Sequence, residues 1–127
     1  MTGVARKKIL VIDDSPLVLE LTRGVLEEAG FAVAIASNLT AFEEERRRTP
    51  PDLILVDVQM PEAFGDDVGQ LLRDVRRVGV PIILFSSLSE RALAERTEEA
   101  GLTGYVPKAA GVGALLERIK GILGESS

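Results

Sequence analysis

Five short runs of apolar and β-branched residues recur along this chain, separated by about 20 to 30 residues. Each run has the length and composition of a β-strand. The third run, Leu-Ile-Leu-Val, has no polar position, which is typical of a strand covered on both faces. The five predicted strands are residues 9–12, 31–35, 53–56, 81–85 and 104–106.

The segments between these runs have helical periodicity, with apolar residues three and four positions apart. Ser15 before Pro16 predicts a helix N-cap, and Gly30 and Gly101 predict helix ends. The two clearest apolar stripes are Val18, Leu21, Thr22, Val25 and Ala29 in the first helix, and Val112, Leu115, Leu116, Ile119 and Leu123 in the last.

Strand and helix alternate throughout, which predicts βα units, right-handed crossovers and a parallel sheet with helices on both faces. We therefore expect an α/β fold: a doubly wound, five-stranded parallel sheet of order 2-1-3-4-5, as in flavodoxin-like sandwiches. At 127 residues the chain is expected to be one domain, with a core over about 7–123 and a tail at 124–127.

Composition excludes several classes of function. The formal charge of −5 disfavours a nucleic-acid surface, and the mixed run 43–48, Glu-Glu-Glu-Arg-Arg-Arg, is predicted to be a solvated helix face. The chain has neither Cys nor His, so carboxylates, hydroxyls and lysines must supply any chemistry. It has no apolar stretch long enough to span a membrane and no signal peptide, so a cytoplasmic protein is expected.

Polar residues follow four of the predicted strands. Asp13 and Asp14 follow the first strand, Asp57 the third, Ser86 the fourth and Lys108 the fifth. Ligands bind at the carboxyl edge of such sheets. In the order 2-1-3-4-5, the first and fourth strands lie about 4.8 Å from the third, and Lys108 starts roughly 10 Å from Asp57, within reach of an extended side chain.

Each of these residues also has an ordinary explanation. Acidic residues before a helix suit its dipole, Asp57 could initiate a turn, and Ser86 and Lys108 could be surface groups. Their joint placement favours a site. Three crowded carboxylates repel one another unless a cation joins them, and oxygen-only ligands suit Mg²⁺. With a hydroxyl and a lysine, they form the parts of a phosphoryl-transfer site.

These residues also resemble, in order and spacing, the receiver domains of two-component response regulators. The resemblance covers about residues 7–123 and includes the motifs Asp13-Asp14, Asp57-Val-Gln-Met-Pro61, Gly65, Ser86-Ser87, Tyr105 and Lys108.

The resemblance implies a stand-alone receiver that is phosphorylated on Asp57 with Mg²⁺. Asp13, Asp14, Asp57 and the backbone carbonyl of Gln59 would bind the metal. Lys108 and Ser86 would contact the phosphoryl oxygens.

The same resemblance implies signalling by protein binding. Ser86 and Tyr105 would form the switch, and a downstream protein would bind the fourth helix, fifth strand and fifth helix. The phosphodonor would be a sensor histidine kinase, a phosphotransfer protein or a small acyl phosphate. No membrane or nucleic-acid partner is implied.

Some positions depart from the family pattern. Receivers usually have proline directly after the lysine, often in a cis peptide, whereas here Ala109 follows Lys108 and Pro107 precedes it. We expect a trans Lys108–Ala109 bond. Phe64 stands where a small polar or acidic residue is common. Gln59 and Leu88 occupy positions that, in the family, influence the rate of dephosphorylation.

Two other functions are weighed against this one. The first is a receiver-like interaction module that does not switch by phosphorylation, which Ala109 and Phe64 motivate and the retained aspartates disfavour. The second is an enzyme, either an aspartyl-phosphate phosphatase or a nucleotide-binding protein. Gln59 replaces the second aspartate of such phosphatases, and Asp14-Ser15-Pro16 replaces a glycine-rich turn, so no enzyme is expected.

Overall fold

The computed structural model describes residues 6–57 and 79–124. Within them lie strands β1 (Lys8–Ile12), β2 (Ala32–Ala36), β3 (Leu53–Val56), β4 (Ile82–Ser86) and β5 (Gly104–Pro107). The helices are α1 (Pro16–Glu28), α2 (Leu39–Arg48), α4 (Glu90–Ala100) and α5 (Gly111–Leu123), with a short 3₁₀ turn, η2 (Lys108–Ala110), before α5.

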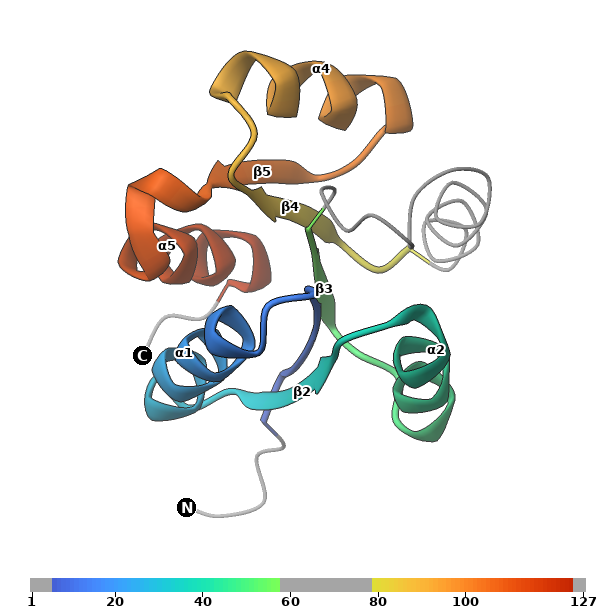
Figure 1. The fold of residues 1–127 in the computed structure, drawn as a ribbon. Helices are drawn as coiled ribbons and strands as arrows, with labels where there is room; N and C mark the ends of the chain where they lie inside the picture. Colours follow the sequence, from blue (N-terminus) through green and yellow to red (C-terminus); the bar gives the residue numbers. More distant parts are fainter. Residues whose placement is uncertain (1–5, 58–78, 125–127) are drawn as a thin grey trace.

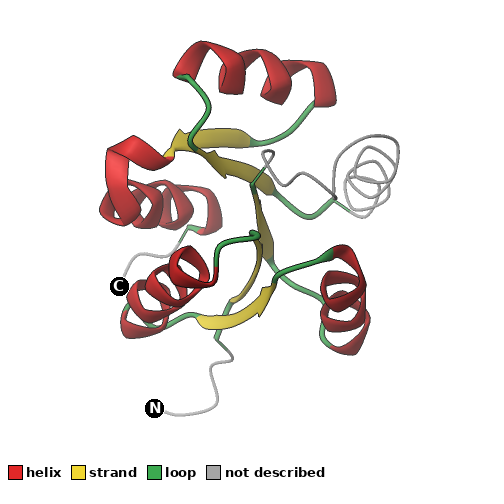
Figure 2. Cartoon of the chain, viewed as in Figure 1, coloured by secondary structure: helices red, strands yellow, loops and turns green. Residues whose placement is uncertain are grey.

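The five strands form one parallel sheet in the order β2-β1-β3-β4-β5 (Figures 1 and 2). This confirms the predicted fold class and strand order. Every predicted strand is present, with ends that differ by one residue at most. All four residues of β3 are buried, as their uninterrupted apolar sequence predicts.

Two hydrophobic clusters pack on opposite faces of the sheet. The first joins alternate residues of β1, β3 and β4 to Phe42 of α2 and Leu93 of α4. The second joins the remaining strand residues to Leu26 of α1 and Ile119 of α5. Figure 1 shows the result, with α1 and α5 together on one side of the sheet and α2 on the other. Both faces of the central strands are thus removed from water, which is the main source of stability for such a sheet.

Local capping fixes the helix ends. The Ser15 hydroxyl accepts the Val18 N–H at 3.3 Å, and Pro16 follows it as predicted. Gly30 and Gly101 have φ angles of 103° and 67°, which non-glycine residues rarely adopt, so each ends its helix as expected.

The apolar stripe predicted for α1 is confirmed only in part. Thr22 is buried, and Val18 and Ala29 pack against the hydrophobic cluster on this face of the sheet, whereas Leu21 is 54% exposed. The other buried residues of the helix are Leu19 and Leu26. The predicted and the buried set both have helical spacing, so periodicity alone cannot choose between them. The last helix follows its prediction, with Leu115 and Ile119 buried.

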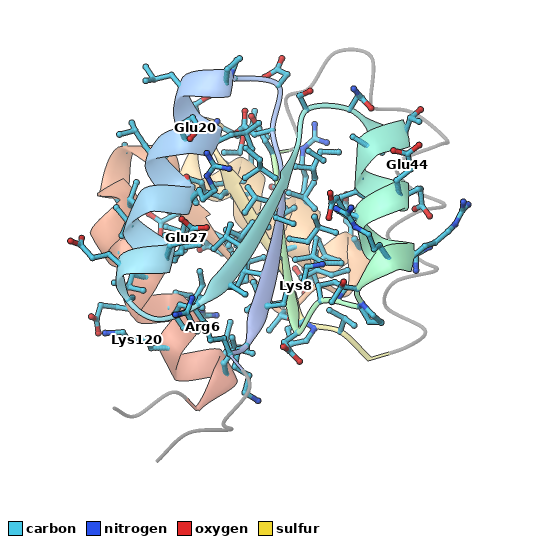
Figure 3. All side chains as sticks on the ribbon, turned by 90° about the horizontal axis from the view of Figure 1, so that it is seen from below. Arg6, Lys8, Glu20, Glu27, Glu44 and Lys120 are labelled. Carbon is cyan, nitrogen blue, oxygen red and sulfur yellow. The ribbon has the colours of Figure 1, made fainter. Side chains whose placement is uncertain are left out.

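The mixed-charge run of α2 is a solvated helix face, as predicted. Arg46 lies 2.7 Å from Glu43, and Arg48 pairs with Glu45. Glu44, also on α2, is exposed (Figure 3). These i,i+3 pairs occupy Arg46 and Arg48, two of the three arginines of the run, within the helix, which disfavours a basic docking patch.

Candidate functional site

Four of the predicted site residues meet at the carboxyl edge of the sheet. Asp13 and Asp14 follow β1, and Asp57 follows β3, which pairs with β1 in register. Carboxylate oxygens of these three residues all lie within 4.8 Å of one another. Lys108 follows β5 at the edge of the sheet, and its ammonium lies within the same cluster.

Asp13 is held on both of its oxygens. Its Oδ1 accepts the backbone N–H of Ser15 at 2.9 Å, and its Oδ2 lies 2.7 Å from the Lys108 ammonium. The residue is only 2% exposed, whereas Asp14 is exposed. The adjacent aspartates therefore differ in role, because one is built into the protein and the other faces water.

Asp57 is the second buried carboxylate of the cluster. It is 4% exposed, its backbone N–H donates to the Ile12 carbonyl at 3.2 Å, and its Oδ2 accepts a hydrogen bond from Lys108 at 3.0 Å. The backbone bond continues the β1–β3 ladder one residue beyond β3. This bond fixes where the carboxylate emerges from the sheet.

Lys108 crosses β4 to reach the carboxylates. It directly follows β5, which is separated from β3 by β4. Its peptide bond to Ala109 is trans, as expected, since the described residues contain no cis bond. With trans geometry at Ala109, the side chain still spans the two strand spacings to Asp57 and Asp13.

The charges at this edge perturb one another. Burial raises the pKa of Asp13 above its ordinary value, even though hydrogen bonds from Lys108 and Ser15 favour the charged carboxylate. Burial alone would lower the pKa of Lys108, but its hydrogen bonds to Asp13 and Asp57 and their negative charge outweigh burial, so the pKa is raised. Lys108 is thus held as a cation between two buried acids.

Ser86 and Tyr105 lie on the opposite side of the sheet from α1 and α5. Ser86 is fully buried at the end of β4, and its Oγ accepts the Leu88 N–H at 3.3 Å. Tyr105 pairs in register with Leu84, two residues before Ser86, and packs against the same cluster. Its hydroxyl donates to Glu90 of α4 at 3.5 Å. The sheet register brings this hydroxyl and this aromatic residue to one face.

The acidic cluster has the donor set of a magnesium site. Asp13, Asp14 and Asp57 offer oxygen ligands only, close enough to share one ion, and the described residues contain no His or Cys that would suit a softer metal. A divalent ion here would supply positive charge to offset carboxylate repulsion and to polarise a phosphoryl group. The fourth predicted ligand, the Gln59 carbonyl, lies outside the described residues, as do Phe64 and Gly65.

Comparison with known proteins agrees with this geometry. Residues 9–120 match the response regulator receiver domain. The chain belongs to this family. A polar-differentiation response regulator, DivK of Brucella ovis, is 30% identical over 122 residues, which cover 94% of this chain and 98% of that protein.

Solved receivers have the same fold. A receiver domain from Methanospirillum hungatei is 27% identical, with a TM-score of 0.81 and coverage of 95% of this chain and 96% of that one. The BeF₃-activated receiver domain of Klebsiella pneumoniae RstA is 30% identical, with a TM-score of 0.77 and coverage of 90% and 96%. No helix in the described part of this receiver is both long and apolar enough to cross a membrane.

Sequence reasoning missed two features near the site. The Phe85 ring lies 6.0 Å from the Lys108 ammonium, and nothing in the sequence pairs these residues. Leu17 and Leu21, one turn apart on α1, are the exposed large hydrophobic residues of the described chain, at 69% and 54%. The spacing of four between these leucines was the available signal, but Leu21 was assigned to the predicted apolar stripe and Leu17 to no feature.

Proposed function

We propose that this receiver signals by phosphorylation of Asp57, with Mg²⁺ held by Asp13, Asp14, Asp57 and the Gln59 carbonyl. The observation that supports this best is the position of the Lys108 ammonium, 2.7 Å from Asp13 and 3.0 Å from Asp57. An ammonium in this position can donate a hydrogen bond to an oxygen of a phosphoryl group bound beside Asp57.

In the proposed reaction, a carboxylate oxygen of Asp57 attacks the phosphorus of the donor. A new O–P bond forms, and the bond from phosphorus to the donor's leaving atom breaks. Its electron pair stays with that atom, a nitrogen in a phosphohistidine or an acyl oxygen in a small acyl phosphate. Lys108 would then contact one phosphoryl oxygen, and Ser86 would donate its hydroxyl hydrogen to another.

The switch would use Ser86 and Tyr105. When Ser86 turns toward the phosphoryl group, its bond to the Leu88 N–H is lost and space opens beside Tyr105. An inward move of Tyr105 would break its contact with Glu90 and change the surface of α4, β5 and α5. A downstream protein would read that surface. This surface contains a hollow of about 360 Å³, lined by seven residues: Glu90, Tyr105, Val106, Pro107, Ala110, Ala114 and Arg118.

The phosphodonor is proposed to be a protein of the histidine-kinase or phosphotransfer type. Leu17 and Leu21 support this, because α1 begins three residues after Asp13 and exposes both leucines beside the acidic edge. Such side chains are suited to pack against an apolar surface of a partner. We also propose that the chain acts as one domain without enzymatic turnover of external substrates.

The test is phosphorylation with acetyl phosphate and Mg²⁺, followed by intact mass. We expect a gain of one phosphoryl group in the wild type and none in Asp57→Ala. The Mg²⁺ site is tested separately by titration. Asp14→Asn should weaken Mg²⁺ binding without altering the metal-free fold, because Asp14 is exposed. Glu44→Gln, which removes an exposed acid on α2, is the matched control (Figure 3).

Two results would count against the proposal. Wild-type protein that binds Mg²⁺ but gains no phosphoryl group would favour the alternative, an interaction module that does not switch by phosphorylation. A phosphoryl group found equally in Asp57→Ala would place the acceptor elsewhere.

A further inference from the structure

Phe85 occupies the point in the sheet that the Lys108 side chain must cross. In the register of β4 and β5, Phe85 pairs with Val106 and Ser86 with Pro107, so Lys108 leaves β5 one residue beyond the last pair. To reach Asp57, its side chain passes the end of β4. Neighbouring residues on a strand point to opposite faces, so the Phe85 ring and the Ser86 hydroxyl flank this path on opposite sides of the sheet.

The ammonium lies over the aromatic ring as well as beside the carboxylates. The Lys108 nitrogen is 6.0 Å from the centre of the Phe85 ring, at the outer limit of the distance at which a ring face attracts a cation. Phe85 is itself 4% exposed and packs in the cluster shared by α1 and α5. A buried ring is fixed by its neighbours, so it can act as a rigid reference for a flexible side chain.

The backbone after Lys108 restricts this side chain little. Ala109, Ala110 and Gly111 follow it, the two alanines are exposed, and Gly111 has a φ angle of 92°. The α5 helix begins there without a side-chain N-cap. The direction of the lysine is therefore set by what its side chain contacts, which is the two carboxylates at its end and the Phe85 ring.

We propose that Phe85 is a positioning residue whose ring holds the Lys108 ammonium toward Asp13 and Asp57. This inference rests on the proposed function, in which Lys108 contacts the phosphoryl group. Without the ring, the lysine would spend more time extended into water, and fewer molecules would be ready to receive a phosphoryl oxygen. The ring acts through the lysine and touches no reacting atom.

The experiment changes the electron density of the ring while keeping its shape. Phenylalanine analogues with one and then three ring fluorines are placed at position 85, because fluorine weakens the attraction of the ring face for a cation. Phe85→Leu removes the ring. The matched controls are the same changes at Phe31, which is fully buried in the same cluster but lies directly before β2.

Two measurements are made on each protein. The first is the second-order rate constant for phosphorylation by acetyl phosphate with Mg²⁺. We expect a stepwise fall with fluorine number and a loss of about twofold to fivefold in Phe85→Leu, with little change at Phe31. The second is the proton NMR shift of the Lys108 methylene beside its nitrogen. The ring should shift that signal upfield, and Phe85→Leu should abolish the shift.

Equal effects at positions 85 and 31, or a rate that ignores fluorination, would overturn the inference, since a packing role depends on shape alone. If the wild type gains no phosphoryl group at all, the proposed function fails. The Lys108 signal then decides the positioning role: loss of the shift only in the Phe85 variants supports it, and an unchanged signal overturns it.

Discussion

The Lys108 ammonium donates a hydrogen bond to Asp57 Oδ2 at 3.0 Å, although 51 residues separate the two in the chain. The same nitrogen lies 2.7 Å from Asp13 Oδ2. One cation that follows the edge strand β5 thus joins two acids that follow β1 and β3. Among the described residues, Lys108 is the cation that pairs with both buried carboxylates and so offsets the cost of burying them.

Replacing Lys108 with Met should destabilise the metal-free protein by about 2–4 kcal/mol, because two buried carboxylates lose their cation. This loss of stability should be smaller than for a completely buried ion pair, because the Lys108 side chain is 20% exposed. Urea denaturation with a chelator measures the free energy of unfolding. Lys7→Met, which removes an exposed lysine, is the control. Added Mg²⁺ should restore more stability to Lys108→Met than to the wild type, and a variant as stable as the wild type would contradict this account.

Asp13 predicts a specific pH dependence of stability. Its pKa is raised in the folded protein above the ordinary 3.8, chiefly by burial, so the folded state binds the proton more tightly than the unfolded state. Its contribution to the free energy of unfolding should therefore fall as pH rises from 3.8 through the folded pKa. The free energy of unfolding of the wild type minus that of Asp13→Asn, both measured without metal, isolates this contribution and should fall over the same pH range. If this value instead rises with pH over this range, the ion pair with Lys108 outweighs burial.

The exposed leucines of α1 should matter for a protein phosphodonor only. Leu17→Gln with Leu21→Gln should leave stability within about 0.5 kcal/mol of the wild type, because both side chains are exposed. Phosphorylation by acetyl phosphate should also be unchanged. Phosphotransfer from a cognate kinase, timed with radiolabelled phosphate, should slow about tenfold, as for the loss of about 1.4 kcal/mol of docking energy. Glu27→Gln, at the other end of α1 (Figure 3), is the control, and equal slowing there would argue against a leucine contact.

Thr22 offers a change that should stabilise the fold. It is fully buried in α1, and its hydroxyl has no hydrogen-bond partner among the described residues. Thr22→Val keeps the branched shape and removes the unsatisfied hydroxyl, so thermal or urea denaturation should show a gain of about 0.5–1 kcal/mol. Thr22→Ala should instead lose stability, because it removes a buried methyl group. Destabilisation by valine would mean that the hydroxyl is satisfied in solution, for instance by a water.

Much of the fold could be predicted because it depends on local pattern. Apolar runs such as 53–56 form strands, Ser15 and Pro16 start a helix, and Gly30 and Gly101 end helices for conformational reasons that each residue brings with it. The alternation of the elements then limits the topology to a few parallel sheets. The family resemblance was confirmed, since residues 9–120 match the receiver domain.

The buried face of α1 could be predicted only in part. The predicted stripe and the buried set, which is Leu19, Thr22 and Leu26, share Thr22, and both have spacings of three and four. Which residues face the core depends on the angle at which the helix packs against β2 and α5. That angle results from contacts between distant segments, so it cannot be predicted from the spacing of residues in a single sequence.

The sequence by itself determined the elements, their order and the types of residue at the carboxyl edge: acids after β1 and β3, a serine at the end of β4 and a lysine after β5. Only the tertiary structure decided that Lys108 crosses β4 to bind Asp13 and Asp57, that it lies over Phe85, and that Asp14 stays in water while Asp13 is buried. The reason is physical. Strand and helix preferences act over a few neighbouring residues, whereas these contacts depend on sheet register and packing between segments far apart in the chain.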